Sequence, residues 1–162
     1  MLFRSLAEAL ATIPPGRRMY VEIKCGPEVL PELERVLRAA DCAPEQLVII
    51  GFNDETMRQV RRRLPHLETL WLCSYKEDKR TKRFPVIGEL IGKAKAAGFA
   101  GLDLNAKFPL TPAVVAEIKE AGLKLAVWTV NDADAARSLA AVGVDSITTD
   151  RPGWLREQMA SQ

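Results

Sequence analysis

Six strand-like segments alternate with helix-like segments along the 162-residue chain. A helical pattern follows each strand pattern, and another over residues 2–13 precedes the first. No group of strands stands apart from the helices. This alternation predicts an α/β fold with parallel strands and right-handed crossovers. The predicted strands cover residues 19–24, 47–52, 67–73, 99–104, 124–130 and 145–149.

Two architectures fit this pattern. One strand and one helix recur about every 25 residues, close to the roughly 30 residues per unit of an eight-stranded (β/α) barrel. A flat, doubly wound sheet of six strands fits the pattern equally well. The alternation alone therefore leaves the choice open.

The first predicted strand carries an unusual pair of charges. Alternation places Tyr20, Glu22 and Lys24 on one face, with Val21 and Ile23 on the other. Burial of an unpaired charge is costly, and α/β proteins concentrate their chemistry at the carboxyl ends of strands. The pair is therefore a candidate for a binding or catalytic role. A solvated surface ion pair is an equally good interpretation.

Composition narrows the class of protein. The chain is 48% hydrophobic and 27% charged, as expected of one soluble globular domain over residues 1–162. A net charge of +2 gives no reason to expect nucleic-acid binding, and no apolar run reaches the ~18 residues that span a bilayer. Three cysteines without a CxxC pair predict a reducing, cytoplasmic location.

Several polar residues have simpler structural interpretations. Asn53 and Thr111 stand where they would cap the helices that follow them, and Asn131 and Asp150 are expected to be helix caps or loop anchors. The run of basic residues within 74–83 is interleaved with acidic ones, which favours a solvated surface. Cys25 has no histidine base nearby in the sequence and is expected to be a packed cysteine.

Several short motifs together resemble the glycerophosphodiester phosphodiesterase family. They are Val-Glu-Ile-Lys at 21–24, Ile-Gly-Phe at 50–52, Trp-Thr-Val-Asn-Asp at 128–132 and Gly-Val-Asp-Ser-Ile-Thr-Thr-Asp-Arg-Pro at 143–152. Residues 5–16 also resemble the helix that the family places before its Glu-Ile-Lys strand. The resemblance extends from residue 6 to residue 155. It implies an incomplete TIM-type (β/α)8 barrel of about six parallel strands, corresponding to strands three to eight.

The resemblance also implies a chemistry. The family cleaves a glycerophosphodiester into glycerol 3-phosphate and an alcohol, with a divalent cation (Ca²⁺ or Mg²⁺) held by carboxylates and two histidines as general acid and base. Glu22 matches the family's metal-binding glutamate. Lys24 matches the adjacent lysine, a phosphate contact or charge partner, and Trp128 matches an aromatic residue that lines the pocket. Lys24 and Trp128 are therefore the candidate substrate-binding residues, for a glycerophosphodiester or glycerol phosphate.

The family's remaining functional motifs do not occur in this sequence. His-Arg-Gly, Glu-x-Asp and the following His-Asp are all missing, and the single histidine, His66, precedes the strand at 67–73, at the bottom of a barrel. No catalytic residue is therefore assigned. One carboxylate is a poor site for a cation that prefers about six oxygen ligands, so tight metal binding is not expected.

We therefore predict no phosphodiesterase activity from this chain alone. The alternatives are a non-catalytic protein that binds phosphate esters and a self-associating remnant of a barrel. An incomplete barrel leaves edges at residues 20–24 and 145–149, which predicts a homo-oligomer formed through those edges. Two alternatives do not require a homo-oligomer. The edges could close into a smaller sheet, or the chain could be part of a longer gene product.

Overall fold

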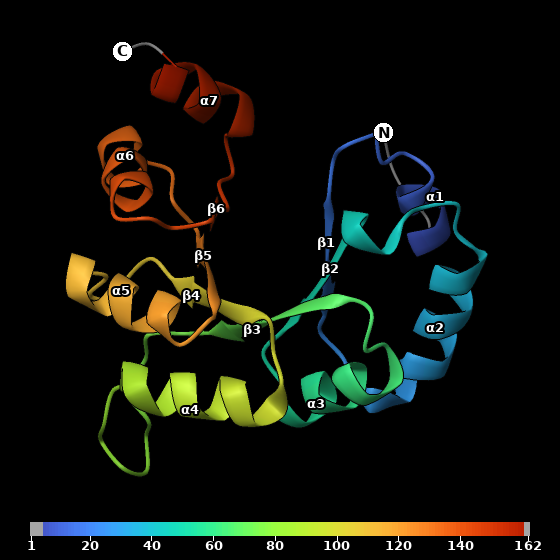
Figure 1. Ribbon diagram of the computed structural model, residues 1–162, viewed down its shortest axis with the longest axis horizontal. Coiled ribbons are helices and arrows are strands. Elements are labelled where there is room, and N and C mark those ends of the chain that lie inside the picture. The colour runs from blue at the N-terminus through green and yellow to red at the C-terminus, as the bar shows by residue number, and fades with distance from the viewer. Residues whose placement is uncertain (1–4, 161–162) are drawn as a thin grey trace. The chain divides into compact units, whose positions relative to one another are not determined.

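The computed structural model describes residues 5–160 and divides into two compact units (Figure 1). One unit ends at Leu70 and the other begins at Trp71, inside strand β3 (Glu68–Cys73). The strands follow one another in chain order, β1-β2-β3-β4-β5-β6. Six parallel strands alternating with helices confirm the predicted incomplete TIM-type α/β fold. A single domain over residues 1–162 stays a prediction.

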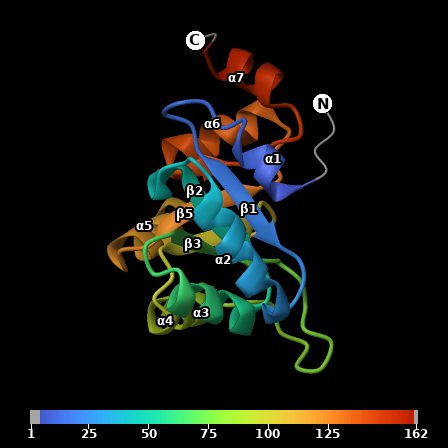
Figure 2. The same cartoon turned by 90° about the vertical axis from the view of Figure 1, so that its right-hand side faces the viewer.

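The first unit is organised around a parallel pair of strands. Strand β1 runs beside β2, from Met19 opposite Leu47 to Ile23 opposite Gly51. Helix α2 lies in front of this pair in Figure 2. Besides the start of β3, the elements are α1 (Leu6–Leu10), β1 (Met19–Ile23), η1 (Pro27–Val29), α2 (Leu30–Ala39), η2 (Pro44–Gln46), β2 (Leu47–Gly51) and α3 (Asp54–Arg63).

Local sequence explains most element ends in this unit. The apolar run of β2 is almost wholly buried, as expected of a strand covered on both faces. The predicted helix over 27–40 begins with a 3₁₀ turn, and Pro31 lies in the first turn of α2, where a missing N–H costs least. Asn53 caps α3 as predicted, because its Oδ1 accepts a hydrogen bond from the N–H of Thr56 at 2.8 Å.

The second unit has the same alternation. Strand β4 pairs in parallel with β5, and β5 with β6. Leu102, Leu104, Leu125 and Val127 are fully buried in this sheet. Besides the end of β3, the elements are α4 (Ile87–Ala97), β4 (Gly101–Asn105), α5 (Pro112–Glu120), β5 (Lys124–Trp128), α6 (Ala133–Ala141), β6 (Ser146–Ile147) and α7 (Pro152–Ala160).

Helix caps in the second unit agree with the sequence at one site and differ at another. Thr111 caps α5, its Oγ1 accepting from the N–H of Val114 at 3.3 Å. Asn131 was expected to cap α6 or to anchor a loop, and the cap is Asp132, whose Oδ1 accepts from the N–H of Ala135 at 2.8 Å. The last strand is also shorter than predicted, with two residues in β6.

Candidate functional site

The carboxyl end of β1 presents the charged pair that the alternation predicted. The Nζ of Lys24 lies 3.4 Å from Oε2 of Glu22. The Lys24 side chain is 78% exposed and that of Glu22 is 30% exposed. The two side chains therefore form a solvated ion pair that a ligand in water can reach, and the pair itself contributes little to stability.

This ion pair lies in a cleft of about 460 Å³. Because Ile23 is in register with Gly51, the residues that follow β1 and β2 emerge at the same edge of the sheet. Phe52, with 45% of its surface exposed, and Asn53 therefore join the charged pair. Neither was predicted as a site residue. The sequence could have indicated both, because they directly follow strand β2, which pairs with β1. The cleft is lined by Glu22, Ile23, Lys24, Cys25, Gly26, Phe52 and Asn53.

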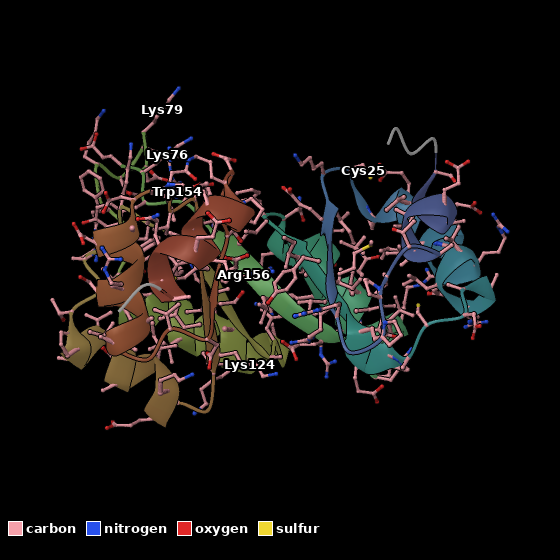
Figure 3. The ribbon with its side chains drawn as sticks, turned by 90° about the horizontal axis from the view of Figure 1, so that it is seen from above. Cys25, Lys76, Lys79, Lys124, Trp154 and Arg156 are labelled. Atoms are coloured by element: carbon pink, nitrogen blue, oxygen red, sulfur yellow. The ribbon has the colours of Figure 1, made fainter. Side chains whose placement is uncertain are left out.

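Cys25 is exposed, so the expectation of a packed cysteine was wrong (Figure 3). Strand β1 ends at Ile23, two residues earlier, so Cys25 belongs to the turn and not to the sheet. The turn is held by the side chain of Glu28, whose Oε1 accepts a hydrogen bond from the N–H of Gly26 at 3.0 Å.

Trp128 is held in the second unit by the neighbouring strand. It is the last residue of β5 and is half-buried. Its indole Nε1–H donates to the carbonyl oxygen of Asp103 in β4 at 3.1 Å. Glu22 and Lys24 belong to the first unit, so a site shared by these three residues stays a prediction.

Asn131 and Asp150 connect the loops that follow β5 and β6. The Nδ2 of Asn131 donates to Oδ2 of Asp150 at 2.7 Å. Its Oδ1 accepts from the Oγ1–H of Thr149 and from the N–H of Asp150, both at 2.9 Å. Of the two roles expected for these residues, helix cap or loop anchor, the hydrogen bonds show that they anchor the two loops.

Asp145, just before β6, is another anchor. Both carboxylate oxygens lie 2.5 Å from Nζ of Lys119, and Oδ2 accepts from the N–H of Leu125 at 2.7 Å. Partial burial opposes ionisation, but the hydrogen bond from Leu125 and the adjacent Lys119 outweigh it. The pKa of Asp145 is therefore lowered below its usual 3.8.

The residues at the β1 cleft do not fit a divalent cation. Within residues 5–160, no three His, Cys, Asp or Glu side chains gather in a group that could hold a metal ion. The acidic residue that lines the cleft, Glu22, already faces the ammonium of Lys24. His66 is exposed and directly precedes the buried Leu67 and strand β3, at the amino end of the strand, as predicted.

No helix among residues 5–160 is both long enough and apolar enough to cross a membrane.

The sequence model of the Glycerophosphoryl diester phosphodiesterase family matches residues 8–154. The comparison with curated proteins finds no match. Among solved structures, a glycerophosphodiester phosphodiesterase from Parabacteroides distasonis is 24% identical, with a TM-score of 0.68 over 88% of this chain and 56% of its own.

Two further solved structures are similar. A phosphodiesterase from Oleispira antarctica, in complex with the product sn-glycerol-3-phosphate, is 21% identical, with a TM-score of 0.74 over 89% of this chain and 56% of its own. A glycerophosphodiester phosphodiesterase from Thermotoga maritima is 16% identical, with a TM-score of 0.73 over 94% of this chain and 62% of its own. This chain thus spans less than two thirds of each, and these similarities establish the fold.

Proposed function

Because the chain belongs to the glycerophosphoryl diester phosphodiesterase family, we propose that it binds glycerol phosphate esters and that residues 1–162 alone do not hydrolyse them. The observation that carries this proposal is the β1 cleft, where the exposed ammonium of Lys24 lies at the carboxyl end of a strand. This is the edge of a parallel sheet where α/β proteins bind their ligands.

The chemistry of the cleft suits a phosphate ester. An exposed lysine attracts the phosphate as a point charge. The Glu22 carboxylate offers acceptors for glycerol hydroxyls, the Nδ2 of Asn53 offers donors because its Oδ1 already caps α3, and Phe52 offers an apolar surface. We also propose Trp128 as a substrate-binding residue, on the ground of the family resemblance, and its indole is held by the hydrogen bond to the carbonyl oxygen of Asp103.

The residues present give little support for hydrolysis by this chain alone. General acid–base catalysis needs titratable groups within hydrogen-bond reach of the reacting atoms. The one histidine, His66, is at the amino end of β3, whereas Glu22 is at the carboxyl end of β1. Glu22 would serve as a metal ligand only if other carboxylates joined it from outside the described residues.

Two measurements test the two halves of this proposal. Incubation of the purified chain with glycerophosphocholine and Ca²⁺ or Mg²⁺, followed by ³¹P NMR, should show no release of glycerol 3-phosphate. Turnover that survives further purification would refute the proposal that this chain alone is inactive. Titration calorimetry with sn-glycerol-3-phosphate should show binding that Lys24→Ala weakens at least tenfold and that Lys95→Ala, at an exposed lysine of α4, leaves unchanged. Absence of binding by the unmodified chain would refute the proposal that it binds glycerol phosphate esters.

A second candidate function is hydrolysis by a completed barrel. The observation that favours it is coverage, since this chain spans 56% of the Oleispira antarctica phosphodiesterase. The catalytic motifs do not occur in this sequence, so the missing strands would have to come from elsewhere and not from a second copy of this chain.

Self-association is a separate proposal. Strands β1 and β6 are the first and last of the strand order, and a second copy of the chain could pair with them. We propose on this ground a homo-oligomer formed through the strand edges. A monomer by light scattering at micromolar concentration would contradict it.

Two further proposals concern organisation and location. The family match runs from residue 8 to residue 154 and so crosses the boundary at Leu70, which supports one partial barrel domain over residues 1–162. All three cysteines, Cys25, Cys42 and Cys73, are free thiols, which supports a reducing, cytoplasmic location. The family match supports a place in glycerophospholipid metabolism.

A further inference from the structure

The segment between β3 and α4 concentrates the positive charge of the protein. Residues 74–86, the basic loop, carry five basic and two acidic side chains and therefore a net charge of +3. The whole chain carries +2, so the rest of the protein is slightly acidic. In Figures 1 and 2 this green loop projects beyond α4.

Most of these cations are available to a partner. Asp78 uses its carboxylate within the loop, where Oδ1 accepts from the N–H of Arg80 at 2.9 Å and from the N–H and Oγ1–H of Thr81 at 2.7 and 3.0 Å. Arg83 lies 3.4 Å from Glu89. Four basic side chains of the loop are exposed and form no ion pair within residues 5–160: Lys76, Lys79, Arg80 and Lys82. Figure 3 labels two of them, Lys76 and Lys79.

Exposed apolar side chains accompany these cations. Phe84 is 49% exposed and Val86 is 45% exposed, and they are two of the four large hydrophobic residues exposed among residues 5–160. Both line a cleft of about 520 Å³, together with Lys76. The apolar and cationic groups therefore share one surface.

The basic loop is also ordered. The Phe84 ring stacks on Tyr75 with centroids 4.9 Å apart, and Tyr75 packs on the buried Phe108 at 4.8 Å. The Asp78 hydrogen bonds turn the chain at the loop tip. A preformed surface of this kind loses little conformational entropy on binding.

We propose that the basic loop docks the protein on the surface of an anionic phospholipid bilayer. Clustered lysines and arginines are attracted to anionic head groups, and adjacent apolar side chains enter the interfacial region. A lipid surface fits better than single-stranded nucleic acid, which needs aromatic faces for base stacking. Here Phe84 already stacks on Tyr75, and Val86 offers apolar volume without a ring. This docking does not depend on ligand binding at the β1 cleft.

Vesicle co-sedimentation of the 162-residue chain tests this inference. The chain should sediment with vesicles of phosphatidylcholine and phosphatidylglycerol and not with phosphatidylcholine alone. Each cation near the surface contributes roughly a fivefold increase in partitioning, so Lys76→Ala, Lys79→Ala and Arg80→Ala combined should reduce it by about two orders of magnitude. A control that removes the same charge elsewhere, Arg17→Ala, Lys95→Ala and Arg156→Ala, should change it less than tenfold.

A second variant separates apolar insertion from charge alone. Phe84→Ser with Val86→Ser should weaken sedimentation at least tenfold, with an unchanged circular dichroism spectrum as the check on folding. The inference is overturned if the unmodified chain fails to bind the anionic vesicles, or if the control triple variant loses as much as the loop variant. Loop-dependent binding of a single-stranded RNA without vesicle binding would overturn it as well.

Discussion

The carboxyl end of β1 and the carboxyl ends of β5 and β6 use polar residues in opposite ways. After β5 and β6, Asn131 makes three hydrogen bonds to Thr149 and Asp150, which hold two loops together. After β1, Glu22 and Lys24 form one solvated ion pair beside an open cleft. The polar residues at the strand ends of this chain therefore divide between those that hold loops together and those that remain exposed to a ligand.

The amino-terminal ends of β5 and β6 follow the first pattern. The carboxylate of Asp145, just before β6, accepts a hydrogen bond from the N–H of Leu125 in β5 and pairs with Lys119 in α5. One side chain therefore connects three segments. Substitutions of the anchors Asp145 and Asn131 should therefore reduce stability, whereas substitutions at the β1 cleft should change binding. All three tryptophans, Trp71, Trp128 and Trp154, lie in the second unit, so their fluorescence reports on its unfolding.

The largest effect is expected from Asp145→Ala. It removes two charge-assisted interactions and leaves the N–H of Leu125 without its acceptor, at a cost of about 2–3 kcal/mol in the free energy of unfolding. Urea unfolding followed by tryptophan fluorescence measures this change. Asp134→Ala removes an ion pair whose carboxylate is 89% exposed and should cost less than about 0.5 kcal/mol. Equal losses for both variants would contradict the anchoring role of Asp145.

The same residue should make stability depend on pH. Because the folded-state pKa of Asp145 is lowered from 3.8, the unfolded state binds more protons at acid pH. Its contribution is thus complete above about pH 5 and is lost as the pH falls through the folded-state pKa. The stability difference between the unmodified protein and Asp145→Asn should shrink below about pH 4. A difference that stays constant down to pH 2 would show that the charge of Asp145 is not involved.

A smaller loss is expected for Asn131→Ala. The substitution removes three exposed hydrogen bonds between the two loops, at about 1–2 kcal/mol in total. Asn105→Ala, which removes one bond to the N–H of Lys107, should cost about 0.5 kcal/mol and serves as the control. Tryptophan fluorescence in urea measures both. The loop anchor would be refuted if Asn131→Ala were no more destabilising than its control.

The smallest effect on stability is expected for Lys24→Ala. An exposed ion pair contributes less than about 0.5 kcal/mol, so far-ultraviolet circular dichroism in urea should show an almost unchanged midpoint. The affinity for sn-glycerol-3-phosphate should nevertheless fall at least tenfold, as expected for loss of a charged hydrogen-bond donor. A large loss of stability with unchanged affinity would contradict the binding role of Lys24 and would make it a structural residue like Asn131.

Features set by neighbouring residues could be predicted from the sequence. The alternation that placed Glu22 and Lys24 on one face is a property of the extended backbone. The caps at Asn53 and Thr111 depend on residues three positions ahead. Motif order was sufficient to recognise the family, because a chain that alternates strands and helices displays its site residues at regular strand ends.

Features set by distant residues had no such signal. Asn and Asp are equally good capping residues, so the sequence does not distinguish Asn131 from Asp132. In the structure Asp132 caps α6, whereas the side chain of Asn131 is hydrogen-bonded to Asp150, 19 positions later. Phe52 and Asn53 join the cleft through the register of β1 against β2.

The sequence alone therefore determined the fold class, most caps and the charged pair at β1. Tertiary structure decided which polar residues are held by partners and which remain exposed, because hydrogen bonds between distant segments depend on strand register and packing, which local patterns do not encode.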